Sequence, residues 1–223
     1  MLLLGEIKGL IYKEIILEWR QKYAFNGLML YIVGAIMIAY LSFSLHQNQL
    51  NPITWNALFW IILLFSAVNT IAKSFMQERA NRLLYYYILA SPQAIIIAKI
   101  IYNILLMLFI SFVGIGGYSL VLGNPVQDLP MFVGNLLLGA LGFSSTLTMV
   151  SGIAAKANNN VTLMAVLSFP ILIPMLLLLI RVSKNALDGL DRTTSFNELF
   201  TLGAMNLIVI VISLLLFPLL WRS

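Results

Sequence analysis

The sequence contains no cysteine and only one histidine, His46, among its 223 residues. Without cysteine the chain has no disulfide framework, no thiolate metal site and no redox dithiol. A hydrolase triad needs an imidazole base, and no serine and acid are arranged recognisably near His46. The histidine and carboxylate pairs of intramembrane metalloenzymes are also missing. The sequence therefore argues against an enzyme and predicts neither catalytic nor metal-binding residues.

Charge is also scarce, at 9% of the residues against about 25% in a soluble globular domain. Hydrophobic residues make up 61% of the chain and form runs long enough to cross about 30 Å of hydrocarbon. These segments lack the alternation of a closed barrel, so they are predicted to be helices. We expect an all-α membrane protein in one transmembrane domain over residues 1–223. The six predicted crossings are 25–45, 53–76, 94–122, 131–155, 161–181 and 199–221.

Residues 1–22 place apolar and charged side chains at helical spacing, immediately before the first crossing. This pattern predicts an amphipathic helix in the membrane interface, entering the first crossing like an elbow. The alternative is an ordinary solvated helix packed on another domain. Glu6 and Lys8 interrupt the opening apolar residues, so we expect no cleaved signal peptide.

The net charge of +5 is explained by membrane topology rather than by nucleic acid. With both termini in the cytoplasm, ten of the 13 cations fall on that side and three on the other. The connections 46–52, 123–130 and 182–198 would then face the opposite compartment. The ten are Lys8, Lys13, Arg20, Lys22, Lys73, Arg79, Arg82, Lys99, Lys156 and Arg222; the three are Arg181, Lys184 and Arg192.

The segment 73–99 contains a polar cluster followed by an aromatic run and by Ser91-Pro92, which ends a helix. This pattern predicts a short amphipathic cytoplasmic helix that contacts a partner. The alternative is an inert loop whose charges only fix the topology. The polar cluster consists of Gln77, Glu78, Arg79, Asn81 and Arg82.

Two prolines, Pro170 and Pro174, interrupt the fifth apolar run. They are four residues apart and therefore lie on one helix face, where each removes a backbone donor and clashes with a preceding carbonyl. We expect a kinked helix. The kink is either static or a hinge that flexes during a transport cycle.

Neither glycine-rich phosphate loop is present in the sequence, so the chain is not expected to hydrolyse ATP by itself. His46 could ligate haem iron, and several methionines could as well. The neighbours of His46, residues 47–49, are however typical of a membrane exit, and methionine is a common packing residue. No cofactor-binding residue is therefore predicted.

Four motifs occur in order along the chain. They are Lys73-x-Phe75-x-x-Glu78, Pro92 followed by Ala98-Lys99, Leu141-Gly142-Phe143, and Phe169-Pro170-x-x-Ile173-Pro174 after a short loop at Lys156. Together they resemble the cytochrome c maturation protein B (haem exporter protein B) family, and a weaker similarity covers nearly the whole chain. The sequence departs from the family at residues 81–85, which lack the frequent Gly-x-Leu-Glu element.

The resemblance implies the permease subunit of an ABC transporter with an ABC-2 exporter-like fold in the bacterial inner membrane. Such a subunit couples a separate ATPase, which binds the ATP, to haem delivery for c-type cytochrome biogenesis. The coupling loop would be residues 77–92, haem would be the cargo, and the other partners would be haem-handling membrane proteins. Two alternatives are an ABC-2 exporter permease for a lipid, polysaccharide or drug, and a membrane scaffold that transports nothing.

Overall fold

The computed structural model describes residues 2–20, 22–44, 50–71, 75, 91–156 and 161–222. Every regular element in these ranges is helical, and six helices are long and apolar enough to span a membrane. The predicted fold class and number of crossings are therefore confirmed. The elements are α1 (Leu2–Arg20), α2 (Lys22–Ser44), α3 (Pro52–Ile71), α6 (Pro92–Leu122), α7 (Leu129–Lys156), α8 (Val161–Leu187), the 3₁₀ helix η1 (Arg192–Ser195) and α9 (Phe196–Arg222).

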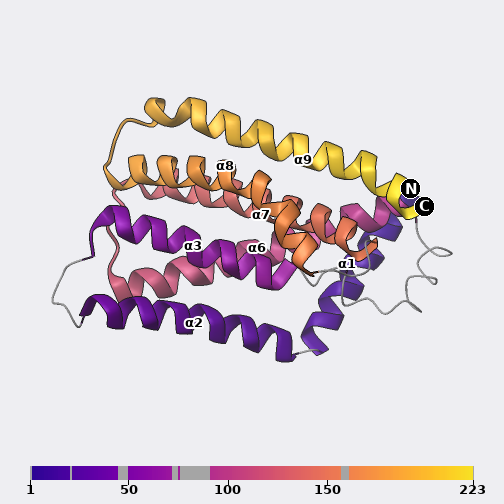
Figure 1. The fold of residues 1–223 in the computed structure, drawn as a ribbon, viewed down its shortest axis with the longest axis horizontal. Coiled ribbons are helices and arrows are strands. Elements are labelled where there is room, and N and C mark those ends of the chain that lie inside the picture. The colour runs from indigo at the N-terminus through magenta and orange to yellow at the C-terminus, as the bar shows by residue number, and fades with distance from the viewer. Residues whose placement is uncertain are drawn as a thin grey trace.

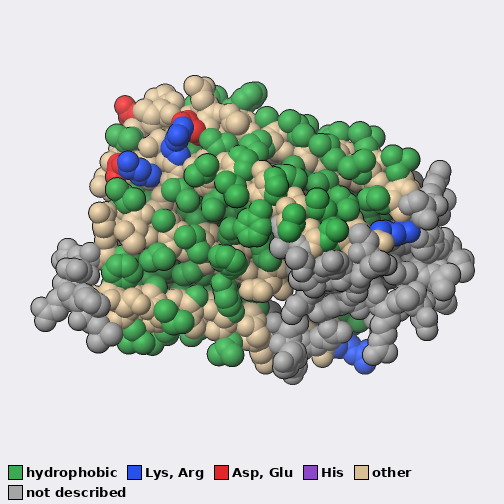
Figure 2. Space-filling model, viewed as in Figure 1, with side chains coloured by type: hydrophobic (Ala, Val, Ile, Leu, Met, Phe, Trp, Pro, Cys, Tyr) green, Lys and Arg blue, Asp and Glu red, His purple; other side chains and the backbone are tan. Residues whose placement is uncertain are grey.

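The six long helices run side by side as a bundle, and α1 crosses one end of it at a steep angle (Figure 1). Both termini lie at this end, as an even number of crossings requires. Helix α7 is central, since it packs on α6, α8 and α9 and most of its residues are buried. Figure 2 shows hydrophobic side chains covering the flank of the bundle, with charged side chains near its ends. This distribution suits a protein surrounded by lipid.

Local sequence signals set the ends of α6 and α7. The Ser91 hydroxyl accepts a hydrogen bond of 3.3 Å from the Ala94 N–H, and Pro92 follows in the first turn of α6. This helix ends at Gly123, whose φ of 80° is costly for any other residue. Asp128 accepts a hydrogen bond of 3.1 Å from the Met131 N–H at the start of α7.

An aromatic cluster holds together the end of the bundle opposite the termini. The Trp55 and Tyr118 rings lie 4.8 Å apart, and Phe59 and Phe132 pack against them. The Trp55 indole donates to the Gly123 carbonyl at 3.0 Å, and the Tyr118 hydroxyl donates to the Trp55 carbonyl at 3.0 Å. Since each ring also has its polar atom satisfied, this cluster fixes α3 against α6 and α7.

Buried asparagines cross-link the helices, each through its side-chain amide. Asn56 donates to the Ile180 carbonyl at 2.8 Å and Asn135 to the Leu179 carbonyl at 2.8 Å, tying α3 and α7 to α8. Asn206 donates to the Leu138 carbonyl at 2.9 Å, tying α9 to α7. In lipid, where hydrophobic burial does not drive helix association, such bonds and close packing do.

Two glycines of α7 allow this close packing. A Cβ on Gly139 would lie 2.8 Å from the Trp60 ring, and one on Gly142 would lie 2.5 Å from the Asn206 side-chain oxygen. Both distances are shorter than van der Waals contact. Gly142, which belongs to one of the family-like motifs, therefore has a structural role between α7 and α9.

The fifth crossing and the connection after it differ from the prediction. Helix α8 continues six residues beyond the predicted end at residue 181, and the connection 182–198 reduces to residues 188–195, half of which form η1. The charged residues Arg181 and Lys184 are exposed, whereas Val182, Ser183 and Ala186 are buried. The prediction was wrong because the buried face of the helix continues between the charges.

Candidate functional site

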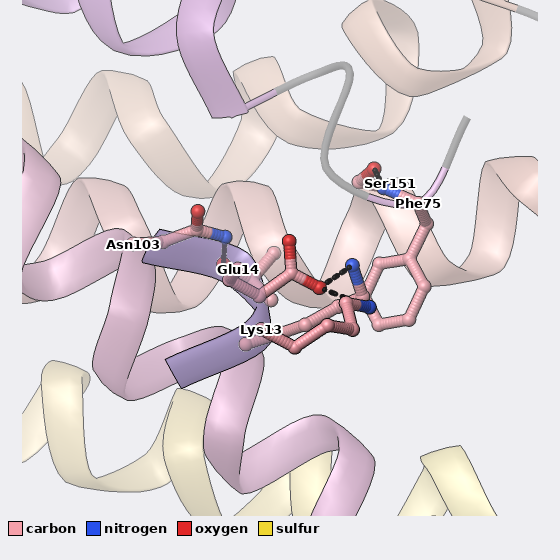
Figure 3. Close-up of polar contacts among 7 residues, drawn as sticks. Lys13, Glu14, Phe75, Asn103 and Ser151 are labelled. Atoms are coloured by element: carbon pink, nitrogen blue, oxygen red, sulfur yellow. Dashed lines mark hydrogen bonds and ion pairs between the residues drawn. The ribbon is translucent and has the colours of Figure 1, made fainter. Parts of the chain in front are cut away.

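The candidate site lies at the end of the bundle that carries both termini, where α1 packs against the first turns of α6. Lys99 of α6 is only 3% exposed, and its ammonium lies 3.3 Å from the Glu14 Oε1 atom of α1. The Lys13 ammonium lies 2.9 Å from the same oxygen, so one carboxylate serves two cations (Figure 3). We give the name α1–α6 junction to this ion pair together with Phe75, which packs beside Lys99, and Ser91, which binds Glu6 of α1.

Phe75 connects the junction to the rest of the bundle. Lys99 lies over its ring, with the ammonium 4.6 Å from the ring centroid. The Phe75 N–H donates to the Ser151 hydroxyl of α7 at 3.4 Å, and its ring lies 5.3 Å from that of Phe217 in α9. One residue therefore contacts α6, α7 and α9.

Ser91 connects the junction to α1 through a second carboxylate. The Glu6 Oε2 atom accepts hydrogen bonds from the Ser91 N–H at 3.1 Å and from its hydroxyl at 2.9 Å. The cap of α6 is thus also an attachment point for α1. Deeper in the bundle, the Asn103 amide donates to the Thr148 hydroxyl at 2.8 Å and joins α6 to α7.

The carboxylates of α1 have different electrostatic environments. Burial alone would raise the pKa of Glu14, but Lys99 and Lys13 hold it below the usual 4.5. Burial raises the pKa of Glu18, one turn later, and the nearby Glu14 carboxylate adds to this effect. Glu18 faces the Tyr102 hydroxyl of α6, whose hydrogen bond opposes the rise in the Glu18 pKa but is outweighed by burial.

The acids of α1 lie on its inner side, a point on which the prediction for residues 1–22 was silent. A separate amphipathic helix is present, and Ile7 on its inner face is buried as expected. The charged residues do not, however, form a common outer face. The carboxylates turn toward α6 because Ser91 and Lys99 offer them donors.

The predicted partner-binding residues lie outside the described residues, as does His46. Gln77, Glu78, Arg79, Asn81 and Arg82 therefore stay a prediction. The residues that flank the segment 76–90, Phe75 and Ser91, are described and both belong to the junction.

Pro170 and Pro174 lie within α8, on its exposed face. The helix is continuous through both prolines, although it changes direction along its length (Figure 1). Leu172 and Met175, between and after them, are buried against the core. The prolines therefore alter the backbone of α8 without contributing to its packed face. Their predicted role as a hinge is untested by this static arrangement.

Glu14 and Lys99 are not identified as site residues from the sequence, where Lys99 is only a motif and topology residue and Glu14 only a charge of the amphipathic segment. One signal was available. Lys99 lies inside the apolar run 94–122, where a cation is costly unless it is paired or faces a protein interior. The sequence contains several acids that could pair with Lys99, and it does not show which of them lies next to Lys99 in the folded protein.

Comparison with known proteins gives one match. The model of a family described as CcmB protein matches residues 6–219, nearly the whole chain. No curated protein and no solved structure matches the sequence. The matched range includes the residues of the α1–α6 junction and both prolines of α8.

Proposed function

The chain belongs to the CcmB family, a family of transporter permease subunits for haem export in cytochrome c biogenesis, and we propose that it couples a separate ATPase subunit to haem delivery. The family match over residues 6–219 carries this proposal, and the six apolar helices supply the membrane domain it needs. No nucleotide loop is present in the sequence, so the energy has to come from a partner.

The α1–α6 junction supports residues 77–90 as the segment that docks the ATPase. One end of this segment follows Phe75, which contacts α6, α7 and α9. The other end precedes Ser91, which is bonded to Glu6 of α1. A displacement of the segment by the ATPase would therefore be transmitted to α1 and to three helices of the bundle.

We place this end of the bundle in the cytoplasm of a bacterial cell, at the inner membrane. Ten of the 13 cations in the sequence then lie inside, and ATP is available to the partner. Single cysteines at positions 127 and 188, in a chain without native cysteine, test the orientation. An impermeant thiol reagent should label both from outside the inner membrane, and labelling only after lysis would reverse the topology.

Haem chemistry is assigned to partner subunits in this proposal. A haem iron held by protein needs axial ligands with supporting hydrogen bonds, and the sequence offers one histidine and no cysteine. The permease would then use the energy of ATP hydrolysis to release a haem-loaded chaperone on the periplasmic side. A stoichiometric haem Soret band from the isolated subunit that disappears in His46→Ala would place the haem site here instead.

The coupling assignment is tested by reversing charges in the docking segment. Glu78→Lys combined with Arg82→Glu should abolish co-purification of the ATPase and assembly of c-type cytochromes, with membrane insertion retained. The matched control is Lys184→Glu combined with Asp191→Lys, two exposed charges at the opposite end of the bundle. Wild-type ATPase binding and cytochrome levels in the first variant would refute the assignment.

A further inference from the structure

Helix α1 has an outer surface that neither the bundle nor the proposed coupling uses. The helix lies across the end of the bundle, so it runs along the membrane surface when the six long helices span the bilayer (Figure 1). Its three carboxylates, Glu6, Glu14 and Glu18, face α6. The charges of α1 are therefore sorted by face, although its sequence contains equal numbers of acids and cations.

The outer surface is apolar and cationic and carries no acid. Leu4 is 73% exposed and Tyr12 66% exposed, and Ile15 and Ile16 are exposed beside them. Lys8 and Arg20 of the same helix are exposed as well. Positions 4, 8, 12, 16 and 20 recur every four residues, so each lies next to the following one on the helix surface, and the row winds gradually around the exposed side. We call these six residues the outer face of α1.

We propose that the outer face of α1 binds the headgroups of acidic phospholipids at the bilayer surface. Exposed Leu, Ile and Tyr side chains on an interfacial helix enter the boundary between headgroups and acyl chains. Lys8 and Arg20 are twelve residues, or about 18 Å, apart along the helix, so they reach separate headgroups. Lys13 is not counted among the lipid-binding cations of the outer face, because its ammonium pairs with the Glu14 carboxylate.

The inward carboxylates make this surface selective for anionic lipid. An acid on the outer face would repel a lipid phosphate and offset one cation, but each acid of α1 faces a partner in α6 or its cap residue Ser91. A basic residue near an anionic surface contributes about a fivefold preference for acidic lipid. Lys8 and Arg20 together should therefore favour acidic over zwitterionic lipid by about 25-fold at low salt.

The test uses the full-length protein in nanodiscs, with a fluorophore on Tyr12→Cys as the only cysteine. Quenching by spin-labelled phosphatidylglycerol and by spin-labelled phosphatidylcholine gives the relative association of the two lipids at the outer face. We expect a clear preference for phosphatidylglycerol that falls at least tenfold in Lys8→Gln/Arg20→Gln. The rescue variant Lys8→Arg/Arg20→Lys should keep the preference, which separates charge recognition from misfolding.

The matched control removes the same two residue types at the opposite end of the bundle, in Arg181→Gln/Lys184→Gln. It should leave the lipid preference at position 12 unchanged. Equal quenching by the two lipids in the wild-type protein would overturn the proposal. A preference that survives Lys8→Gln/Arg20→Gln would overturn it too, as would a lack of quenching by either lipid, which would indicate that a protein partner covers this face.

Discussion

The Lys99 ammonium and the Glu14 carboxylate lie 3.3 Å apart, although 85 residues separate them in the sequence. They join α1, which lies outside the bundle, to α6, which spans it. Both side chains are largely buried, with 4% of Lys99 and 17% of Glu14 exposed. Removing one partner of a buried pair leaves an uncompensated charge, whereas replacing both can be neutral. Single and double variants of this pair therefore separate its effect on protein stability from its effect on the coupling between the ATPase and the bundle.

The first prediction concerns this pair. Glu14→Gln alone should destabilise the protein by about 3–5 kcal/mol, because the buried Lys99 loses the Glu14 carboxylate, whereas Lys99→Met should cost less, because Lys13 still pairs with Glu14. The double variant should recover most of that stability, measured by thermal unfolding followed through the four tryptophans. It should still assemble c-type cytochromes poorly, since the ionic contact between α1 and α6 is lost and only the Glu6–Ser91 attachment and apolar packing remain. Stability and cytochrome levels both restored in the double variant would show that the pair is only structural.

The second prediction concerns pH and uses two carboxylates of α1, Glu14 and Glu18, as each other's control. The lowered pKa of Glu14 means that its contribution to stability is complete above 4.5 and is lost as the pH falls below that value. The raised pKa of Glu18 means that its ionisation costs stability at neutral pH, and this cost vanishes below 4.5.

At pH 7, Glu14→Gln should therefore lower the unfolding temperature and Glu18→Gln should raise it. Both differences from the wild-type protein should shrink toward zero as the pH falls through 4.5 toward 3. Unfolding temperatures measured across this range check the signs. A stabilising Glu14→Gln, or a destabilising Glu18→Gln at pH 7, would contradict the electrostatic description of the junction.

The number of crossings could be predicted from the sequence because hydrocarbon imposes a minimum length on each apolar run. The end of α8 could not, because hydropathy responds to Arg181 and Lys184 but not to the face that each occupies. Both side chains are exposed while Val182, Ser183 and Ala186 stay buried, so the helix continues past the charges. To predict the end of α8, the helical spacing of the apolar residues after position 181 would have had to count for more than the two charges.

The junction was less predictable than the fold. Phe75 and Lys99 were noticed as motif residues, but the partners of Lys99 come from a helix 85 residues away. The amphipathic pattern of residues 1–22 indicated a helix, but it did not show that Glu6 and Glu14 find donors in Ser91 and Lys99. Such pairing depends on the tertiary arrangement, which periodicity within one segment does not contain.

The third prediction tests the close packing around α7. Gly139→Ala should destabilise the protein by about 1–3 kcal/mol, because the new Cβ would lie 2.8 Å from Trp60. The ring has little freedom to move, since its indole donates to the Ser183 hydroxyl at 2.8 Å. Gly134→Ala in the same helix is the control, with nothing within 4 Å of the added Cβ. Equal unfolding temperatures for the two variants would contradict this account of the packing.

The last prediction is that Pro170 and Pro174 matter for transport more than for folding. Each proline deprives the carbonyl four residues earlier, at Val166 and at Pro170, of its helical hydrogen bond. Since both rings lie on the exposed face, replacing them with alanine removes little packing from the core. The double variant Pro170→Ala/Pro174→Ala should therefore insert, bind the ATPase and unfold at or above the wild-type temperature.

The same variant should lose most of its c-type cytochrome assembly, because restored hydrogen bonds would stiffen α8 where the cycle needs it to bend. Pro218→Ala, the corresponding change at a proline within α9, is the control and should keep wild-type assembly. Cytochrome levels in membranes, measured beside ATPase co-purification, separate loss of transport from loss of the complex. Normal cytochrome levels in a double variant that inserts and binds the ATPase would mean that the bend in α8 is static, since a helix with its hydrogen bonds restored would then support the full cycle.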